Sequence, residues 1–142
     1  MAVTTSPDRR PPPVGLPRPE ELDPSRLAVG YDRTSDILLV HFGNRGRFGV
    51  VDYVGEPDYL AVLRDVEGDD VVGLQIEDFL ARAIVDDPTR LDLLEVAELR
   101  GITPDEVGAL RAEAARGARK RSAVADLLRA LEWGERPPAG GA

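Results

Sequence analysis

His41 is the first residue to weigh for chemistry, because histidine is the side chain whose ordinary pKa lies nearest neutrality and the sequence contains one. Its place in a strand could put it beside Asp36 or Asp52, and Asp52 or Asp58 could then orient its ring. The chain has no cysteine, and no serine lies in a pattern that predicts an activated nucleophile. We therefore expect a structural histidine at the surface or edge of a sheet and no catalytic residue. An enzyme ranks third among the functions considered.

Acidic side chains gather around Gly68, where oxygen atoms could in principle surround a calcium or magnesium ion. The residues are Asp65, Glu67, Asp69 and Asp70. Their spacing falls short of the DxDxDG pattern, and the segment is too short to wrap an ion as a calcium loop of about twelve residues does. One histidine and no cysteine also exclude multi-histidine and thiolate sites. We expect a solvated turn and no metal.

The glycine-rich segment 43–49 carries two arginines but no phosphate-binding motif. It lacks the lysine of a P-loop and the strand-to-helix context of a dinucleotide fingerprint. The segment therefore predicts a hairpin turn, and no cofactor is expected. Arg45 and Arg47 could still hold a phosphate or a partner's carboxylate, because guanidinium groups bind such anions through two hydrogen bonds.

The amino-acid composition limits the kinds of binding partner that we expect. The 142 residues include 18 basic and 26 acidic side chains, for a net charge of -8, which makes duplex nucleic acid a poor default partner. No apolar run approaches the roughly 20 residues of a membrane-spanning helix, and the start has no apolar signal core. We expect a cytoplasmic protein without a membrane partner.

Proline content and charge predict four segments. Seven of the twelve prolines lie in residues 1–24, which predicts a disordered leader. Residues 25–87 hold six basic and thirteen acidic side chains, whereas residues 88–142 hold nine of each, so a boundary is expected near Pro88. We predict a sheet domain over 25–87, a helical extension over 88–134 and a disordered tail over 135–142.

Short runs rich in β-branched and aromatic residues predict strands within the acidic block. They lie at 27–31, 37–42, 48–53, 59–63 and 71–76. Gly, Asn, Asp and Pro supply tight turns between them, and such short connections favour antiparallel neighbours. The expected fold is α+β: a small antiparallel β-meander of four to five strands packed with C-terminal helices.

Apolar spacing and capping residues place the helices. Residues 77–86 carry an apolar stripe, and Thr89 is expected to cap a second helix whose buried face ends near Leu99, before Gly101. Thr103 and Pro104 form a strong start signal for a third helix. Propensity leaves open whether that helix runs to Trp133 or stops near Gly117, with Ser122 capping a fourth helix.

Two stretches resemble a known family. The tyrosine–aspartate turn and strand at 31–40, together with the strand at 71–77, resemble the bacterial domain-of-unknown-function family 2283 over about residues 27–84. The resemblance implies a small antiparallel sheet with a helix and no established activity, so no catalytic residue is carried over. The region after Pro88 departs from the compact form of that family.

The segment 93–111 has small and apolar residues at the spacing of a helix-turn-helix. Its second helix would begin with two carboxylates, which repel the duplex. Basic side chains follow at Arg111, Arg116, Arg119, Lys120 and Arg121. A DNA-binding regulator is therefore the alternative function, and a plain helical hairpin is the favoured structure.

The same region predicts a weak seam for self-association. Apolar and small residues recur at three-four spacing from Val107 to Leu131, with little to bury in the middle. A homodimer is therefore one of the expected assemblies.

The expected function is non-catalytic protein binding, of the antitoxin or adaptor kind, with a basic partner protein. The acidic sheet domain would be the recognition surface. Its candidate partner-binding residues are Asp52, Asp65, Glu67, Asp69, Asp70, Arg45 and Arg47.

Overall fold

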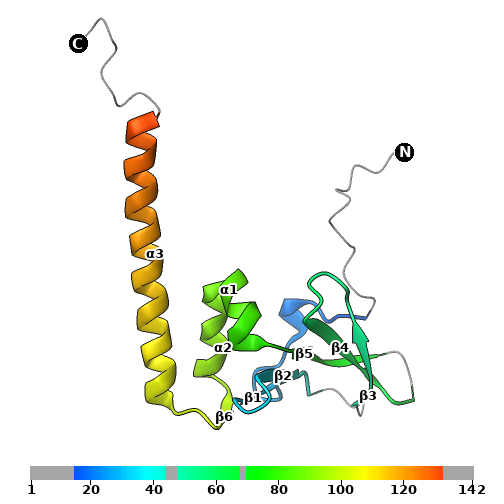
Figure 1. The fold of residues 1–142 in the computed structure, drawn as a ribbon. Coiled ribbons are helices and arrows are strands. Elements are labelled where there is room, and N and C mark those ends of the chain that lie inside the picture. Colours follow the sequence, from blue (N-terminus) through cyan, green and yellow to red (C-terminus); the bar gives the residue numbers. More distant parts are fainter. Residues whose placement is uncertain (1–14, 44–47, 68–69, 133–142) are drawn as a thin grey trace, which may run out of the picture. The chain divides into compact units, whose positions relative to one another are not determined.

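The structure, a computed structural model, describes residues 15–43, 48–67 and 70–132 (Figure 1). The chain divides into two compact units, one reaching to Pro104 and the other beginning at Asp105. The first unit contains a sheet with short helices, and the second contains one long helix.

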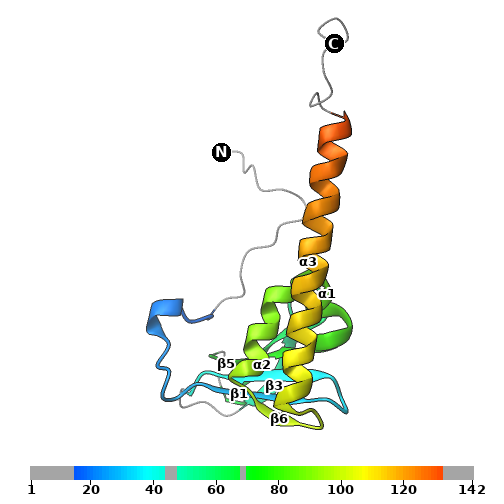
Figure 2. The ribbon, with the colours of Figure 1, turned by 90° about the vertical axis from the view of Figure 1, so that its left-hand side faces the viewer.

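Six strands form one mixed sheet in the order β3-β4-β5-β2-β1-β6. Figure 2 shows this sheet with the short helices that follow β5 on one side of it. The strands are β1 (Ala28–Asp32), β2 (Ile37–His41), β3 (Phe48–Tyr53), β4 (Leu60–Asp65), β5 (Val71–Ile76) and β6 (Glu98–Arg100). All neighbouring pairs are antiparallel except β1 and β6, which run parallel. The α+β class is confirmed.

The predicted meander is wrong in its order and its strand number. β2 pairs with β5 and not with β3, so β2 and β3 do not form the hairpin that the segment 43–49 predicted. Gly73 allows the closeness of β2 and β5, because a Cβ there would lie 2.2 Å from the carbonyl oxygen of Val40. The hairpins β1–β2, β3–β4 and β4–β5 form as predicted.

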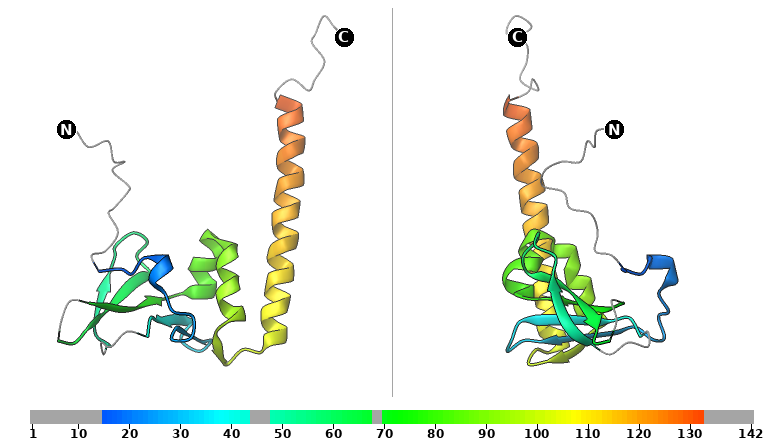
Figure 3. Two further views of the ribbon diagram at one scale, coloured as in Figure 1. Left: turned by 180° about the vertical axis from the view of Figure 1, so that it is seen from behind. Right: turned by 90° about the vertical axis from the view of Figure 1, so that its right-hand side faces the viewer.

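Short helices follow β5 and bury the apolar face of the sheet (Figure 3). They are the π-helix η2 (Phe79–Ala83), α1 (Ile84–Asp86), the 3-10 helix η3 (Pro88–Leu91) and α2 (Asp92–Glu95); a separate 3-10 turn, η1 (Pro19–Glu21), precedes the sheet. Phe79, Ala83, Leu91 and Leu94 are buried. The Phe79 ring lies 5.7 Å from that of Tyr31, so η2 packs on the β1 side of the sheet.

The predicted helix from Thr89 to about Leu99 is wrong at both ends. Asp87 caps its start, since the Asp87 side chain accepts the N–H of Thr89. The helix stops at Glu95, and β6 follows. β6 pairs with the outer side of β1, which gives the backbone groups of that strand hydrogen-bond partners they would otherwise lack. Because β6 belongs to the sheet, the division of the chain lies after Pro104 and not near Pro88.

The second unit is dominated by α3 (Pro104–Glu132). Pro104 stands at its first position, as the start signal predicts. The helix continues through Gly117, which settles the open question of one helix or two. Among the helices of the described residues, none combines the length and the apolar composition of a membrane-spanning segment.

Candidate functional site

β3 is an edge strand whose side chains are largely exposed. Of the described strands, only β4 pairs with it. Phe48, Val50 and Tyr53 are each about half exposed, at 51%, 49% and 51%. Val66, which directly follows β4, is also 51% exposed, and the Gly49 backbone lies close against it. An exposed apolar edge strand is a surface on which another chain can pair.

The ladder shows which backbone groups of β3 are available to a partner. The N–H of Val54 donates to the carbonyl of Leu60 at 3.0 Å, which makes 54 and 60 a hydrogen-bonded pair. In an antiparallel ladder such pairs alternate with non-bonded ones. Val51 and Tyr53 therefore direct their N–H and C=O groups away from β4.

The predicted acidic residues lie next to this edge. Asp52 is on β3 itself, and its carboxylate is 3.1 Å from Nε of Arg64. Asp65 is paired across the ladder with Phe48, and Glu67 and Asp70 are exposed on the connection from β4 to β5. Arg45, Arg47 and Asp69 lie outside the described residues. The structure thus brings one apolar strand and several carboxylates together.

The carboxylates that could have oriented His41 have other hydrogen-bond partners. Asp36 accepts the Tyr31 hydroxyl at 2.6 Å, Asp58 accepts from Arg82 at 2.7 Å, and Asp52 is paired with Arg64. His41 itself is half-buried, and its Nδ1 accepts the N–H of Gly43 at 3.0 Å. That contact gives the ring a local structural role at the end of β2.

Sequence reasoning missed a polar network around Tyr59. The Tyr59 hydroxyl donates to Asp86 at 2.6 Å and accepts from Arg90 at 2.8 Å. Burial and the hydrogen bond to Asp86 raise the pKa of Tyr59. Arg82 and Arg90 also lie over its ring, at 5.2 and 5.9 Å from the centroid. The polar atoms of this cluster are hydrogen-bond partners of one another. Their contacts connect the β3–β4 turn to α1 and η3.

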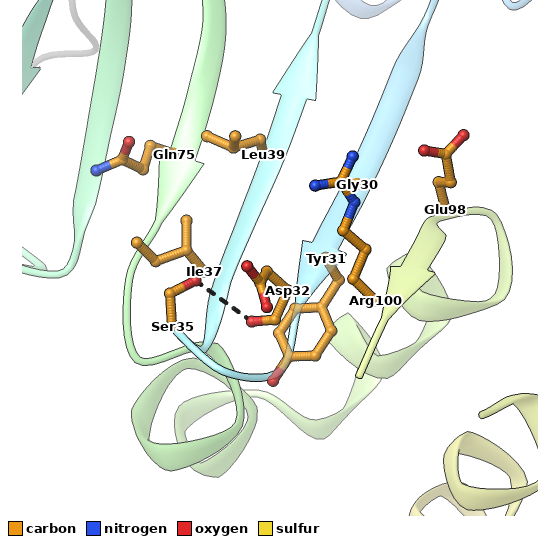
Figure 4. Close-up of a pocket in the computed structure, with 9 residues that line it drawn as sticks. All are labelled: Gly30, Tyr31, Asp32, Ser35, Ile37, Leu39, Gln75, Glu98 and Arg100. Carbon is orange, nitrogen blue, oxygen red and sulfur yellow. Dashed lines mark hydrogen bonds between the residues drawn. The ribbon is translucent and has the colours of Figure 1, made fainter. Parts of the chain in front are cut away.

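A second feature that sequence reasoning missed is a hollow of about 370 Å³ near the other edge of the sheet (Figure 4). It is lined by Gly30, Tyr31, Asp32, Ser35, Ile37, Leu39, Gln75, Glu98 and Arg100. Five of these residues stand on β1 and β2, while Glu98 and Arg100 come from β6. The hollow depends on the parallel pairing of β6 with β1, for which the sequence contains no local signal.

The helical hairpin favoured for 93–111 and the helix-turn-helix alternative are both wrong in their first helix, because α2 ends at Glu95 and residues 98–100 form β6. The basic residues of the alternative, Arg111, Arg116, Arg119, Lys120 and Arg121, lie on α3. Arg116, Arg119 and Lys120 share one side of the helix at three-four spacing, whereas Arg121 lies on another. Within the described ranges, no three metal-ligating side chains gather at one point.

Comparisons with protein-family models, curated proteins and solved structures find no match to this chain. The resemblance to family 2283 therefore stays a prediction, and the candidate site is argued from geometry alone.

Proposed function

We propose that this protein is a non-catalytic binding module that pairs a basic, extended segment of a partner protein with β3. The observation that carries the proposal is the open apolar edge. Val51 and Tyr53 direct backbone groups outward that no other described strand pairs with, beside half-exposed aromatic and aliphatic side chains. Addition of a strand to such an edge provides main-chain hydrogen bonds, and side-chain contacts then select the sequence.

The charge around the edge favours a basic partner. Asp52, Glu67 and Asp70 are exposed beside β3 or its neighbouring turn. Exposed ion pairs contribute little, roughly 0–1 kcal/mol each. Their main effect is to speed encounter with a positive segment and to reject acidic ones. Affinity would come mostly from apolar surface covered at Phe48, Val50 and Tyr53.

Selection from a displayed library of extended peptides tests this proposal, with the full-length protein as the immobilised bait. We expect enriched peptides to alternate Lys or Arg with apolar residues. Val51→Pro should abolish the enrichment, because proline removes an outward N–H and leaves the β3–β4 ladder intact. A circular dichroism spectrum equal to that of the unmodified protein shows that the variant folds.

A matched pair of charge reversals separates local charge from net charge. Glu67→Lys lies beside the edge, whereas Glu113→Lys lies on α3 and changes the net charge by the same amount. The first should weaken the selected peptides by about three- to tenfold, and the second should leave them unchanged. Peptides without basic residues, or equal effects of the two variants, would overturn the proposal.

A further inference from the structure

We propose that the hollow beside β6 binds a free α-amino acid with an aliphatic side chain. The site goes beyond the proposed function, because the hollow spans β5, β2, β1 and β6, whereas the peptide edge is β3 at the opposite end of the sheet. Its volume, about 370 Å³, lies at the small end of ligand pockets. A ligand of a few heavy atoms fits that size.

The strand register places the lining in two rows. Glu98, Gly30, Leu39 and Gln75 are cross-strand neighbours on β6, β1, β2 and β5, and Arg100, Asp32 and Ile37 form the next row. The charged side chains therefore stand on β6 and β1, and the aliphatic side chains of Ile37 and Leu39 lie beside them on β2 (Figure 4). Such a surface offers separate places for an apolar body and for charged groups.

Gly30 keeps the floor of the hollow open. A Cβ built at this position would meet nothing nearer than the Glu98 carbonyl oxygen, at 4.0 Å. The space above β1 is therefore empty because the residue has no side chain. Leu39, its cross-strand neighbour on β2, is 44% exposed. Together they offer an apolar contact to a ligand.

The charged groups of the hollow are available to a ligand. Among the described residues, no carboxylate lies within ion-pairing distance of the Arg100 guanidinium, and Glu98 also makes no ion pair. One oxygen of Asp32 accepts the N–H of Thr34 at 2.9 Å, which holds that carboxylate in place. A guanidinium binds a carboxylate through two hydrogen bonds, and a carboxylate binds an ammonium group.

The balance of charge selects a zwitterion. One arginine and two carboxylates line the hollow. A ligand with a carboxylate alone would be repelled by Asp32 and Glu98, and one with an ammonium group alone would leave Arg100 without a partner. A free amino acid supplies both charges on one carbon. Its aliphatic side chain can then lie over Ile37 and Leu39.

Titration of the full-length, isotope-labelled protein with L-leucine, followed by amide chemical shifts, tests the inference. We expect saturable shifts at Gly30, Leu39 and Glu98, with a dissociation constant of about a millimolar. N-acetyl-leucine and leucine methyl ester, which lack one charge each, should bind at least about tenfold more weakly. Glycine should bind more weakly as well, because it has no side chain.

Three variants locate the site. Arg100→Gln should weaken leucine binding at least about tenfold, and Gly30→Val should abolish it by filling the hollow. Arg116→Gln, on α3, should leave binding unchanged while altering the net charge equally. The absence of saturable shifts with leucine, equal affinity for N-acetyl-leucine, or binding that survives Arg100→Gln would overturn the inference. The comparison of leucine with its two derivatives and glycine uses the unmodified protein, so it remains a valid test even if the Gly30→Val protein misfolds.

Discussion

The hydroxyl of Tyr31 donates to Oδ1 of Asp36 at 2.6 Å, and this contact fixes a carboxylate that serves two parts of the fold. The same side chain accepts the N–H groups of Leu80 and Ala81 at 2.9 and 3.1 Å. The Asp36 carbonyl also accepts the N–H of Phe79. Asp36 thus ties the β1–β2 turn to the start of the π-helix, which lacks a capping hydrogen bond from its own Asp78.

Asp36→Ala should lower the free energy of unfolding by about 3 kcal/mol or more, because three hydrogen bonds to a carboxylate are lost together. Asp36 also has a positive φ of 57°, a conformation that alanine tolerates poorly. Asp36→Asn keeps one oxygen and suits that conformation, so it should cost clearly less. Urea unfolding measures both. Equal losses for the two variants would contradict a hydrogen-bonding role.

Because of the Tyr31 hydroxyl, we expect the free energy of unfolding to fall at basic pH. Burial, the hydrogen bond to Asp36 and the charge of that carboxylate raise the pKa of Tyr31 above its ordinary value. The folded protein therefore keeps this proton where the unfolded chain loses it. The resulting stabilisation is complete below pH about 10 and is lost as the pH rises further.

Urea unfolding between about pH 8 and pH 11 checks this expectation with Tyr31→Phe as the comparison. The phenylalanine keeps the packing against Phe79 but has no hydroxyl proton to lose. The stability advantage of the unmodified protein should shrink as the pH rises. An advantage that grows with pH would show that the sign of the pKa shift is wrong.

Two glycines should respond to alanine in opposite ways. At Gly73 the added Cβ would lie 2.2 Å from the Val40 carbonyl oxygen, whereas at Gly117 nothing lies within 4 Å. Gly73→Ala should destabilise the sheet by about 2 kcal/mol or more, because β2 and β5 must separate. Gly117→Ala should stabilise α3 by roughly 0.5–1 kcal/mol. Thermal melting of the two variants measures both effects. A Gly73→Ala variant as stable as the unmodified protein would contradict the close approach of β2 and β5.

Local signals account for the parts of the fold that the sequence predicts. Thr103 and Pro104 mark the start of α3 through capping chemistry, and Asp, Gly and Pro mark three hairpins that form. The pairings that sequence reasoning missed are non-local. Neither the insertion of β5 beside β2 nor the pairing of β6 with β1 involves a turn signal, so both depend on packing across the whole sheet.

The candidate sites divide in the same way. Composition and strand patterns indicate an acidic sheet, and Asp52 and Glu67 do lie beside an open edge. The hollow at Arg100 could not be predicted. In the sequence, residues 98–100 continue the apolar spacing of a helix, and only the structure shows that they pair with β1. Nothing in the printed sequence marks Gly30 as an open floor, since its role depends on which neighbours surround it.

His41→Ala should leave peptide selection unchanged, because the ring contacts its own loop at Gly43 and lies on β2, away from β3. Its cost should be about 1 kcal/mol of stability, the value of one hydrogen bond. Repeating the display selection with this variant checks the expectation. A complete loss of enrichment in a folded variant would point instead to a functional histidine.

Amide hydrogen exchange along β3, with and without a selected basic peptide, tests the central claim most directly. The outward N–H groups of Val51 and Tyr53 should exchange rapidly in the free protein and become strongly protected with peptide, while the inward N–H of Asp52 changes much less. Exchange at Val51 and Tyr53 that is unaffected by a saturating peptide would contradict strand addition at β3.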